Sequence, residues 1–224
     1  MLSYGPGGFL AKESPGWLER RGRSRLDVEE TVREILLDHP SVIAVWLVGS
    51  RKTGRTTSLS DLDLQVDVEL DGFERFRRDL PDLVDVLEPL GKMWDPLGDH
   101  WNYMLMLSGP LKVDLIIDIP QVESPPWQVS SETLPTIEHH FWDWTLWLGS
   151  KQLHSQIGLV HSELGKMHEH LLKPLGVASS PTSLAEAVES YTAARNQAEQ
   201  HLGMAVDRTM ETQVTRALLD AGVV

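Results

Sequence analysis

The sequence predicts an α+β protein in which a mixed β-sheet flanked by helices comes first and a C-terminal α-helical bundle follows. Up to about residue 120, short apolar runs typical of strands are interleaved with segments of helical period. After a proline-rich stretch, apolar residues recur at steps of three and four, which is typical of bundle helices. The expected units are a loose N-terminal arm at 1–25, a mixed unit at 26–120, a linker at 121–135 and a helical bundle at 136–224.

The mixed unit is expected to begin with a helix, a strand, a second strand and a second helix. The first helix is expected over about 26–38, where apolar residues share one face. Ile43 to Val48 is a short apolar run rich in β-branched residues, which predicts a buried strand. Leu62 to Val68 alternates between apolar and polar residues and predicts another strand. Residues 73–89 return to the helical period.

Two further strands and three further helices complete the prediction. The runs Tyr103 to Leu107 and Leu111 to Ile117 are joined by three residues only, and such a short link predicts an antiparallel hairpin. In the bundle, two helices are expected around Leu184 to Leu202 and Met210 to Ala221. The helix before them is expected to carry an apolar seam formed by Leu153, Ile157, Val160, Leu164, Met167 and Leu171.

Composition narrows the classes of protein to which this chain can belong. Of its 224 residues, 41% are hydrophobic and 24% are charged, as expected of a globular protein with a real core. Cysteine is absent, which excludes disulfides and thiolate chemistry. No 18-residue apolar run and no signal-peptide pattern is present, so we expect a cytoplasmic protein with no membrane partner. The net charge of −13 disfavours nucleic acid as a partner and favours a cationic small molecule.

Two aspartates interrupt the second predicted strand. Asp61 and Asp63 share the strand face opposite to the leucines and lie about 6–7 Å apart at Cα, so their carboxylates can converge. Close carboxylates repel, and a proton or a cation relieves the repulsion. Mg²⁺ suits such oxygen ligands, and a two-metal site needs a third acidic ligand. Asp114, which interrupts the last predicted strand in the same way, is the expected third ligand.

A Gly-Ser pair ends the strand that precedes these aspartates. Gly49 allows the backbone to approach a phosphate closely, and the hydroxyl of Ser50 with nearby backbone N–H groups can hold phosphate oxygens. Taken alone, Asp-x-Asp on a strand most often marks the solvent face of a sheet. The combination of Gly-Ser, Asp-Leu-Asp and a later strand aspartate favours a phosphate and metal site instead.

This compound pattern resembles a known family. "VGSRKTGRTTSLSDLDL", followed by "VDLII", is similar to the nucleotidyltransferase superfamily that includes DNA polymerase β, and most to its small-molecule branch, the aminoglycoside nucleotidyltransferases. Ser60, directly before Asp61, matches the Ser-Asp form of the motif. The resemblance covers about residues 43–118 and extends to the plan of a catalytic half followed by a helical half.

The resemblance implies a transferase that moves a nucleoside monophosphate, with AMP as the first choice, from a triphosphate to a hydroxyl of a small acceptor. An aminoglycoside or aminocyclitol acceptor would make it an antibiotic-resistance enzyme. The nucleotide would be bound by Gly49, Ser50 and Ser60. The negative charge of its triphosphate would be neutralised by Arg51, Lys52 or Arg55. Two Mg²⁺ ions would be held by the carboxylates of Asp61, Asp63 and Asp114, the last of which could also help to deprotonate the acceptor.

Some alternatives stay open at this point. A protein-modifying adenylyltransferase and a non-catalytic, antitoxin-like nucleotide-binding component would carry the same fold, and a dimer could complete the cleft. Aromatic and acidic residues could line the acceptor side or simply belong to the core and the solvated surface; they are Trp94, Asp95, Asp99, His100, Trp101, Glu138, His139, His140, Trp142, Asp143, Trp144, Trp147, Glu163 and Glu169.

Overall fold

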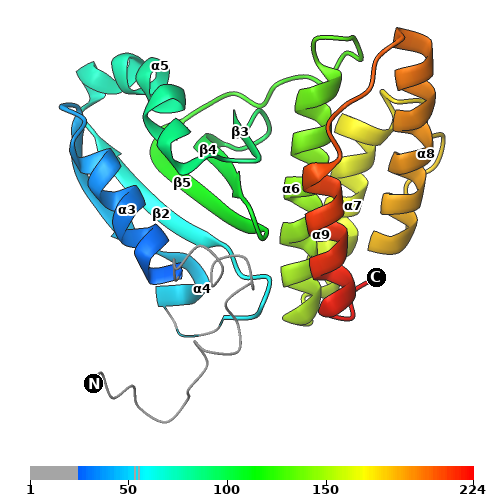
Figure 1. The fold of residues 1–224 in the computed structure, drawn as a ribbon, viewed down its shortest axis with the longest axis horizontal. Coiled ribbons are helices and arrows are strands. Elements are labelled where there is room, and N and C mark those ends of the chain that lie inside the picture. Colours follow the sequence, from blue (N-terminus) through cyan, green and yellow to red (C-terminus); the bar gives the residue numbers. More distant parts are fainter. Residues whose placement is uncertain (1–24, 53, 55) are drawn as a thin grey trace.

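The computed structural model describes residues 25–52, 54 and 56–224. The predicted arm at 1–25 falls almost entirely outside the described residues, as does Arg55. The predicted fold class is confirmed, because a five-stranded mixed sheet with flanking helices is followed by a set of C-terminal helices. Figure 1 shows the sheet between the early helices on one side and the late helices on the other.

The sheet has the strand order β1-β2-β5-β4-β3. The strands β2 and β5 are parallel, and the other neighbouring strands among the described residues are antiparallel. The predicted hairpin is the β4–β5 pair, in which Leu107 faces Leu111. The strands β1 to β5 are, in chain order, Val42–Leu47, Leu62–Val68, Gly91–Trp94, His100–Leu107 and Leu111–Pro120. The short β3 was not expected, because four residues are too few to show a period.

One face of the sheet packs against two helices to form the first hydrophobic core. These helices are α3 (Arg25–Leu37) and α5 (Phe73–Leu83), and a 3-10 turn, η2 (Val84–Leu87), extends the second of them. A second 3-10 turn, η1 (Leu70–Gly72), precedes α5. The alternation in β2 is as predicted. The apolar members of this core from α3, β2 and α5 are Val28, Val32, Leu36, Leu62, Leu64, Val66, Phe73, Phe76 and Leu80.

The prediction of a buried first strand is wrong for most of that strand. β1 is an edge strand, and only Val45 is buried within it. Ile43 and Trp46 are 64% and 55% exposed. Their β-branched and aromatic character favours a strand, but it does not reveal that the sheet ends there with one face uncovered.

The second face of the sheet meets the helical part of the chain. Met106 of β4 packs into the same core as residues of the C-terminal helices. A short π-helical turn, His168–Leu172, directly follows the second of the C-terminal helices, α7 (Ile157–Met167). Among the residues described, no helix combines the length and apolar character needed to cross a membrane. The four helices are α6 (Leu134–Leu153), α7 (Ile157–Met167), α8 (Leu184–Leu202) and α9 (Thr209–Asp220).

The predicted apolar seam is correct for its last four residues only. Val160 and Leu171 bound the part that is buried, whereas Ile157 is 60% exposed and Leu153 already belongs to α6. The chain turns between α6 and α7, where Ser155 adopts a positive φ of 59°. The spacing of apolar residues happens to continue across this turn, so periodicity alone merges the end of one helix with the start of the next.

Candidate functional site

Three carboxylates converge on the second face of the sheet. Asp61 lies directly before β2, Asp63 lies on β2 and Asp114 lies on β5. The parallel register pairs Asp63 with Asp114, which sets their side chains next to each other. One oxygen from each of the three carboxylates lies within 4.8 Å of the others. The structure therefore brings together all three acidic residues that the sequence singles out.

The electrostatics of this cluster are those of a site built for a cation. Burial, followed by repulsion from Asp61 and Asp114, raises the pKa of Asp63 to about 7. Burial and the charge of Asp114 also raise the pKa of Asp61, which is only 3% exposed. Carboxylates that repel one another in a desolvated place favour a proton or a metal ion between them. Carboxylate oxygens at such spacing fit a hard divalent cation such as Mg²⁺.

Gly49 lies in close contact with this cluster. It follows β1, begins the short helix α4 (Gly49–Lys52) and has a φ of +71°. A Cβ added at Gly49 would lie 1.8 Å from Oδ2 of Asp63, so only glycine fits. Ser50 and Arg51 follow in α4. The backbone at Gly49 therefore carries no side chain, and it can approach a ligand that the carboxylates would hold.

Ser60 organises the loop that leads into the carboxylates. Its Oγ accepts a hydrogen bond of 2.7 Å from the backbone N–H of Thr57, and its side chain is buried. The backbone N–H of Ser60 also donates to the carbonyl of Thr57. This closed turn fixes the start of β2 and with it the direction of Asp61.

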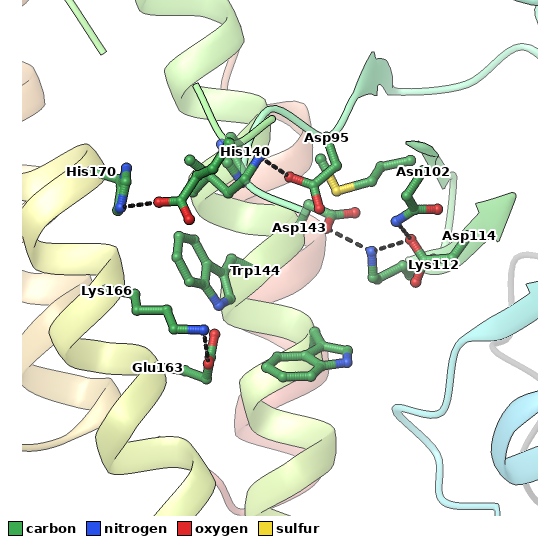
Figure 2. A pocket seen from close by; sticks show the side chains of 14 residues that line it. Asp95, Asn102, Lys112, Asp114, His140, Asp143, Trp144, Glu163, Lys166 and His170 are labelled. Carbon is green, nitrogen blue, oxygen red and sulfur yellow. Dashed lines mark hydrogen bonds and ion pairs between the residues drawn. The ribbon is translucent and has the colours of Figure 1, made fainter. Parts of the chain in front are cut away.

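Sequence reasoning missed a buried lysine at the centre of the site. Lys112 lies on β5, two residues before Asp114 and therefore on the same face. Its Nζ donates to Oδ1 of Asp114 at 2.6 Å and to Oδ2 of Asp143, on α6, at 2.7 Å (Figure 2). Burial opposes the charge of Lys112, but the two carboxylates outweigh it and raise its pKa. The available signal was a lone lysine in an otherwise apolar strand, next to a predicted ligand.

A cavity of about 270 Å³ opens beside Asp114, between the sheet and the helices. Its sheet side includes Asn102 and Asp114, and its helical side includes residues of α6 and α7. Figure 2 shows Trp144 between the Lys112 cluster and the Glu163–Lys166 ion pair of α7. Asp114 therefore belongs both to the carboxylate cluster and to the cavity wall.

The structure shows which of the aromatic residues singled out in the sequence line the cavity and which belong to the core. Trp144 and Trp147 line the cavity, whereas Trp142 is fully buried and donates to Glu138. His140 also lines the cavity and stacks on Trp144 at a ring distance of 5.4 Å. Burial lowers the pKa of His140 to about 3, so its ring is neutral at ordinary pH.

The acidic residues separate in the same way. Asp95, Asp143 and Glu163 line the cavity, and burial raises the pKa of Asp95 and brings that of Asp143 to about 7. Glu138 lies in the helical core, where Arg195 donates to both of its oxygens. Glu138 is therefore structural. Among the described residues, Oδ1 of Asp143 is buried without a hydrogen-bond partner. The same holds for Oδ1 of Asn102. The cavity wall thus offers acceptors that a ligand with donors would satisfy.

Comparisons with known proteins bear on this site. Residues 29–95 match the family model described as nucleotidyltransferase domain, a segment that includes Gly49, Asp61 and Asp63 and ends before Asp114. No curated protein sequence matches the chain. Among solved structures, an aminoglycoside 6-adenyltransferase from Bacillus subtilis is similar, with 11% identity over 90% of this chain and 100% of that chain and a TM-score of 0.32. A likeness of that size decides nothing about acceptor or reaction. The family match agrees with the Gly-Ser and Asp-x-Asp motif, so residues 29–95 of this chain are similar to the nucleotidyltransferase domain.

Proposed function

We propose that this protein transfers a nucleoside monophosphate from a nucleoside triphosphate, with ATP as the first choice, to a hydroxyl of a small acceptor and releases pyrophosphate. The observation that carries the proposal is the cluster of three carboxylates within 4.8 Å, which packs against Gly49 and shares Asp114 with the wall of a cavity. A metal site next to a bare backbone suits a triphosphate, and a cavity next to both suits the molecule that receives the nucleotide.

The carboxylates of Asp61, Asp63 and Asp114 would hold Mg²⁺, two ions in the full site. Their raised pKa values at Asp61 and Asp63 and their close spacing support this fit. Magnesium bound there would offset the charge of the triphosphate and favour departure of pyrophosphate.

The nucleotide would lie along the start of α4. Gly49 lets the backbone approach the β- and γ-phosphates, and the Ser50 hydroxyl can donate to their oxygens. Arg51 and Lys52 bring positive charge to the same short helix. Ser60 acts by fixing the turn before Asp61, which is supported by its hydrogen bond from Thr57.

The acceptor would occupy the cavity and present a hydroxyl to the carboxylate cluster. Asp95, Asp143 and Glu163 give its wall an acidic character, and the rings of Trp144 and Trp147 offer faces for a cation or a sugar. The net charge of −13 supports the same choice. We therefore propose a hydroxylated, cationic acceptor such as an aminoglycoside or aminocyclitol, which would make the reaction one of antibiotic resistance. Asp114, on the shared wall, would help to remove the proton of the attacking hydroxyl.

The domain plan belongs to this proposal. Residues 26–120 would form the catalytic unit, 121–135 the linker and 136–224 the helical unit that closes the acceptor side. The cavity walls support this division, because one side comes from the sheet and the other from α6 and α7. A cytoplasmic location stays a prediction from composition.

The test is Mg²⁺-dependent pyrophosphate release from each of the four triphosphates, with a pooled panel of aminoglycosides and aminocyclitols. The double variant Asp61→Asn with Asp63→Asn is the control. Release by the wild-type protein alone would support the transferase, and it would narrow the choice of both the nucleotide and the acceptor. Nucleotide binding with Mg²⁺ but no release would favour a protein acceptor or a regulatory role. Failure of Mg²⁺ and nucleotide to change wild-type melting relative to the control would overturn the proposal.

A further inference from the structure

We propose that Lys112 is a positioning residue that joins Asp114 of the sheet to Asp143 of α6 and so decides which oxygens of these two carboxylates face the reacting groups. The inference rests on the proposed function and deepens it, because it concerns how the metal side and the acceptor side of one site are held together. No motif in the sequence marks this residue.

The two hydrogen bonds of Lys112, to Asp114 and to Asp143, form a bridge that is short and buried and that connects the two halves of the chain. Lys112 is 5% exposed, and its Nζ lies 2.6 Å from Oδ1 of Asp114 and 2.7 Å from Oδ2 of Asp143. An ammonium group has three donors, so one group can serve both carboxylates. Charge-assisted hydrogen bonds of this length are the strong ones. Lys112 thereby connects a strand of the sheet to the first helix of the C-terminal part.

The bridge leaves Asp114 with one oxygen for the metal site. Oδ1 of Asp114 already accepts from Lys112 and, at 3.2 Å, from Nδ2 of Asn102. Its second oxygen has no such donor among the described residues. Because two donors hold Oδ1, the carboxylate cannot rotate freely, and the second oxygen is the one left for a metal ion.

The bridge also leaves Asp143 with one oxygen for the acceptor. Oδ2 of Asp143 is bound to Lys112, while Oδ1 is buried without a partner in the described part of the chain. Asp143 lines the cavity. A buried oxygen that lacks a donor is costly, and a ligand that brings a hydroxyl or ammonium group would satisfy it. Lys112 therefore sets an acceptor contact on one side and a metal ligand on the other.

Removing the ammonium would release both carboxylates at once. Since both accept from the same nitrogen, at 2.6 Å and 2.7 Å, the two bonded oxygens lie no more than about 5.3 Å apart. Two carboxylates at that separation repel when nothing neutralises them. We expect the Lys112→Met side chain to fill the space while both carboxylates lose their fixed orientation.

The experiment compares Lys112→Met, Asp143→Asn and the double variant. It measures the dissociation constant and stoichiometry of Mn²⁺ by electron paramagnetic resonance and the kcat and KM of pyrophosphate release. Lys92→Met is the matched control: Lys92 lies on β3, and its Nζ donates to the carbonyl of Pro81 on the other side of the sheet. We expect that control to stay within twofold of wild type in every measurement.

The three variants have distinct expected results. Asp143→Asn should weaken Mn²⁺ binding about 3- to 10-fold, because the charge of Lys112 then falls on Asp114 alone. Adding Lys112→Met should restore the Mn²⁺ affinity. Lys112→Met alone should bind Mn²⁺ with wild-type stoichiometry and no loss of affinity, because removing the positive charge beside Asp114 favours a cation and offsets the lost orientation of this ligand. Its kcat should still fall about 100-fold because Asp114 is misplaced. A purely structural role would lower the Mn²⁺ stoichiometry and kcat together.

Two results would overturn this inference. One is a wild-type kcat in Lys112→Met. The other is a weakened Mn²⁺ affinity that persists in the double variant, which would make Asp143 itself a metal ligand. Should Lys112→Met fail to fold, Asp143→Asn alone still decides, because a wild-type Mn²⁺ affinity in that variant would also overturn the inference. A wild-type protein that binds no Mn²⁺ would overturn the proposed function as well, so the two failures are distinguishable.

Discussion

The contact between Gly49 and Asp63 gives the most direct prediction about the site. The substitution Gly49→Ala adds one methyl group at a backbone φ of +71°, where a side chain is disfavoured by about 1–2 kcal/mol. That cost falls on the stability of the folded state. The larger effect is local, because the new Cβ would lie 1.8 Å from Oδ2 and 2.7 Å from Cγ of Asp63.

The size of the displacement follows from these distances. Ordinary contact of a Cβ with a neighbouring atom begins at 3.4 Å, so the carboxylate of Asp63 must move by about 1.6 Å. The three ligand oxygens lie within 4.8 Å of one another, and a shift of that size takes one of them out of place. A misplacement of about 1 Å in a catalytic site costs on the order of 100-fold in rate. We expect Gly49→Ala to lose at least that much in kcat and to bind Mn²⁺ at least about tenfold more weakly.

The chain supplies a matched control in Gly54. Its φ is +68°, and an added Cβ would meet no atom of the described residues within 4 Å, so Gly54→Ala carries the same backbone strain without the clash. Urea unfolding should show a similar loss of stability in both variants, and only Gly49→Ala should lose Mn²⁺ binding and pyrophosphate release. Full Mn²⁺ affinity together with more than a third of wild-type kcat in Gly49→Ala would refute the reasoning.

Four further outcomes are expected. The double variant Asp61→Asn with Asp63→Asn should lose Mn²⁺ binding in a calorimetric titration and at least about 1000-fold in kcat, with an unchanged circular dichroism spectrum. Mn²⁺ affinity should rise with pH up to about 7 and then level off, because burial raises the pKa of Asp63 to about 7 and a metal must displace its proton; a pH-independent dissociation constant between pH 5.5 and 8 would contradict this. Trp144→Ala should raise the KM of the acceptor about tenfold and leave the KM of the triphosphate unchanged, which steady-state kinetics with each substrate varied would check. Arg195→Met should lower the free energy of unfolding by about 3 kcal/mol, because it removes the cation that is hydrogen-bonded to buried Glu138 and leaves only Arg208, at 3.9 Å; an unfolding curve like that of the wild type would argue against this explanation.

Local patterns were enough to find the elements and the acidic ligands. The alternation from Leu62 to Val68 separates an apolar face from a polar one, and the structure buries Leu62, Leu64 and Val66 as predicted. The spacing of Asp61 and Asp63 places them on one face without any knowledge of the partner strands. The Gly-Ser pair is an equally local feature, because the glycine reflects the backbone conformation that is required at one strand end. Each of these features depends on residues that are neighbours in the chain.

Long-range pairing decided the rest. Only the parallel register of β2 with β5 sets Asp114 beside Asp63, and only the position of β1 at the sheet edge leaves Ile43 and Trp46 exposed. The bridge from Lys112 to Asp143 joins residues 31 positions apart, which no local period connects. A sequence period shows which face of an element is apolar, but what lies opposite that face depends on contacts between distant segments, and these form only when the chain has folded.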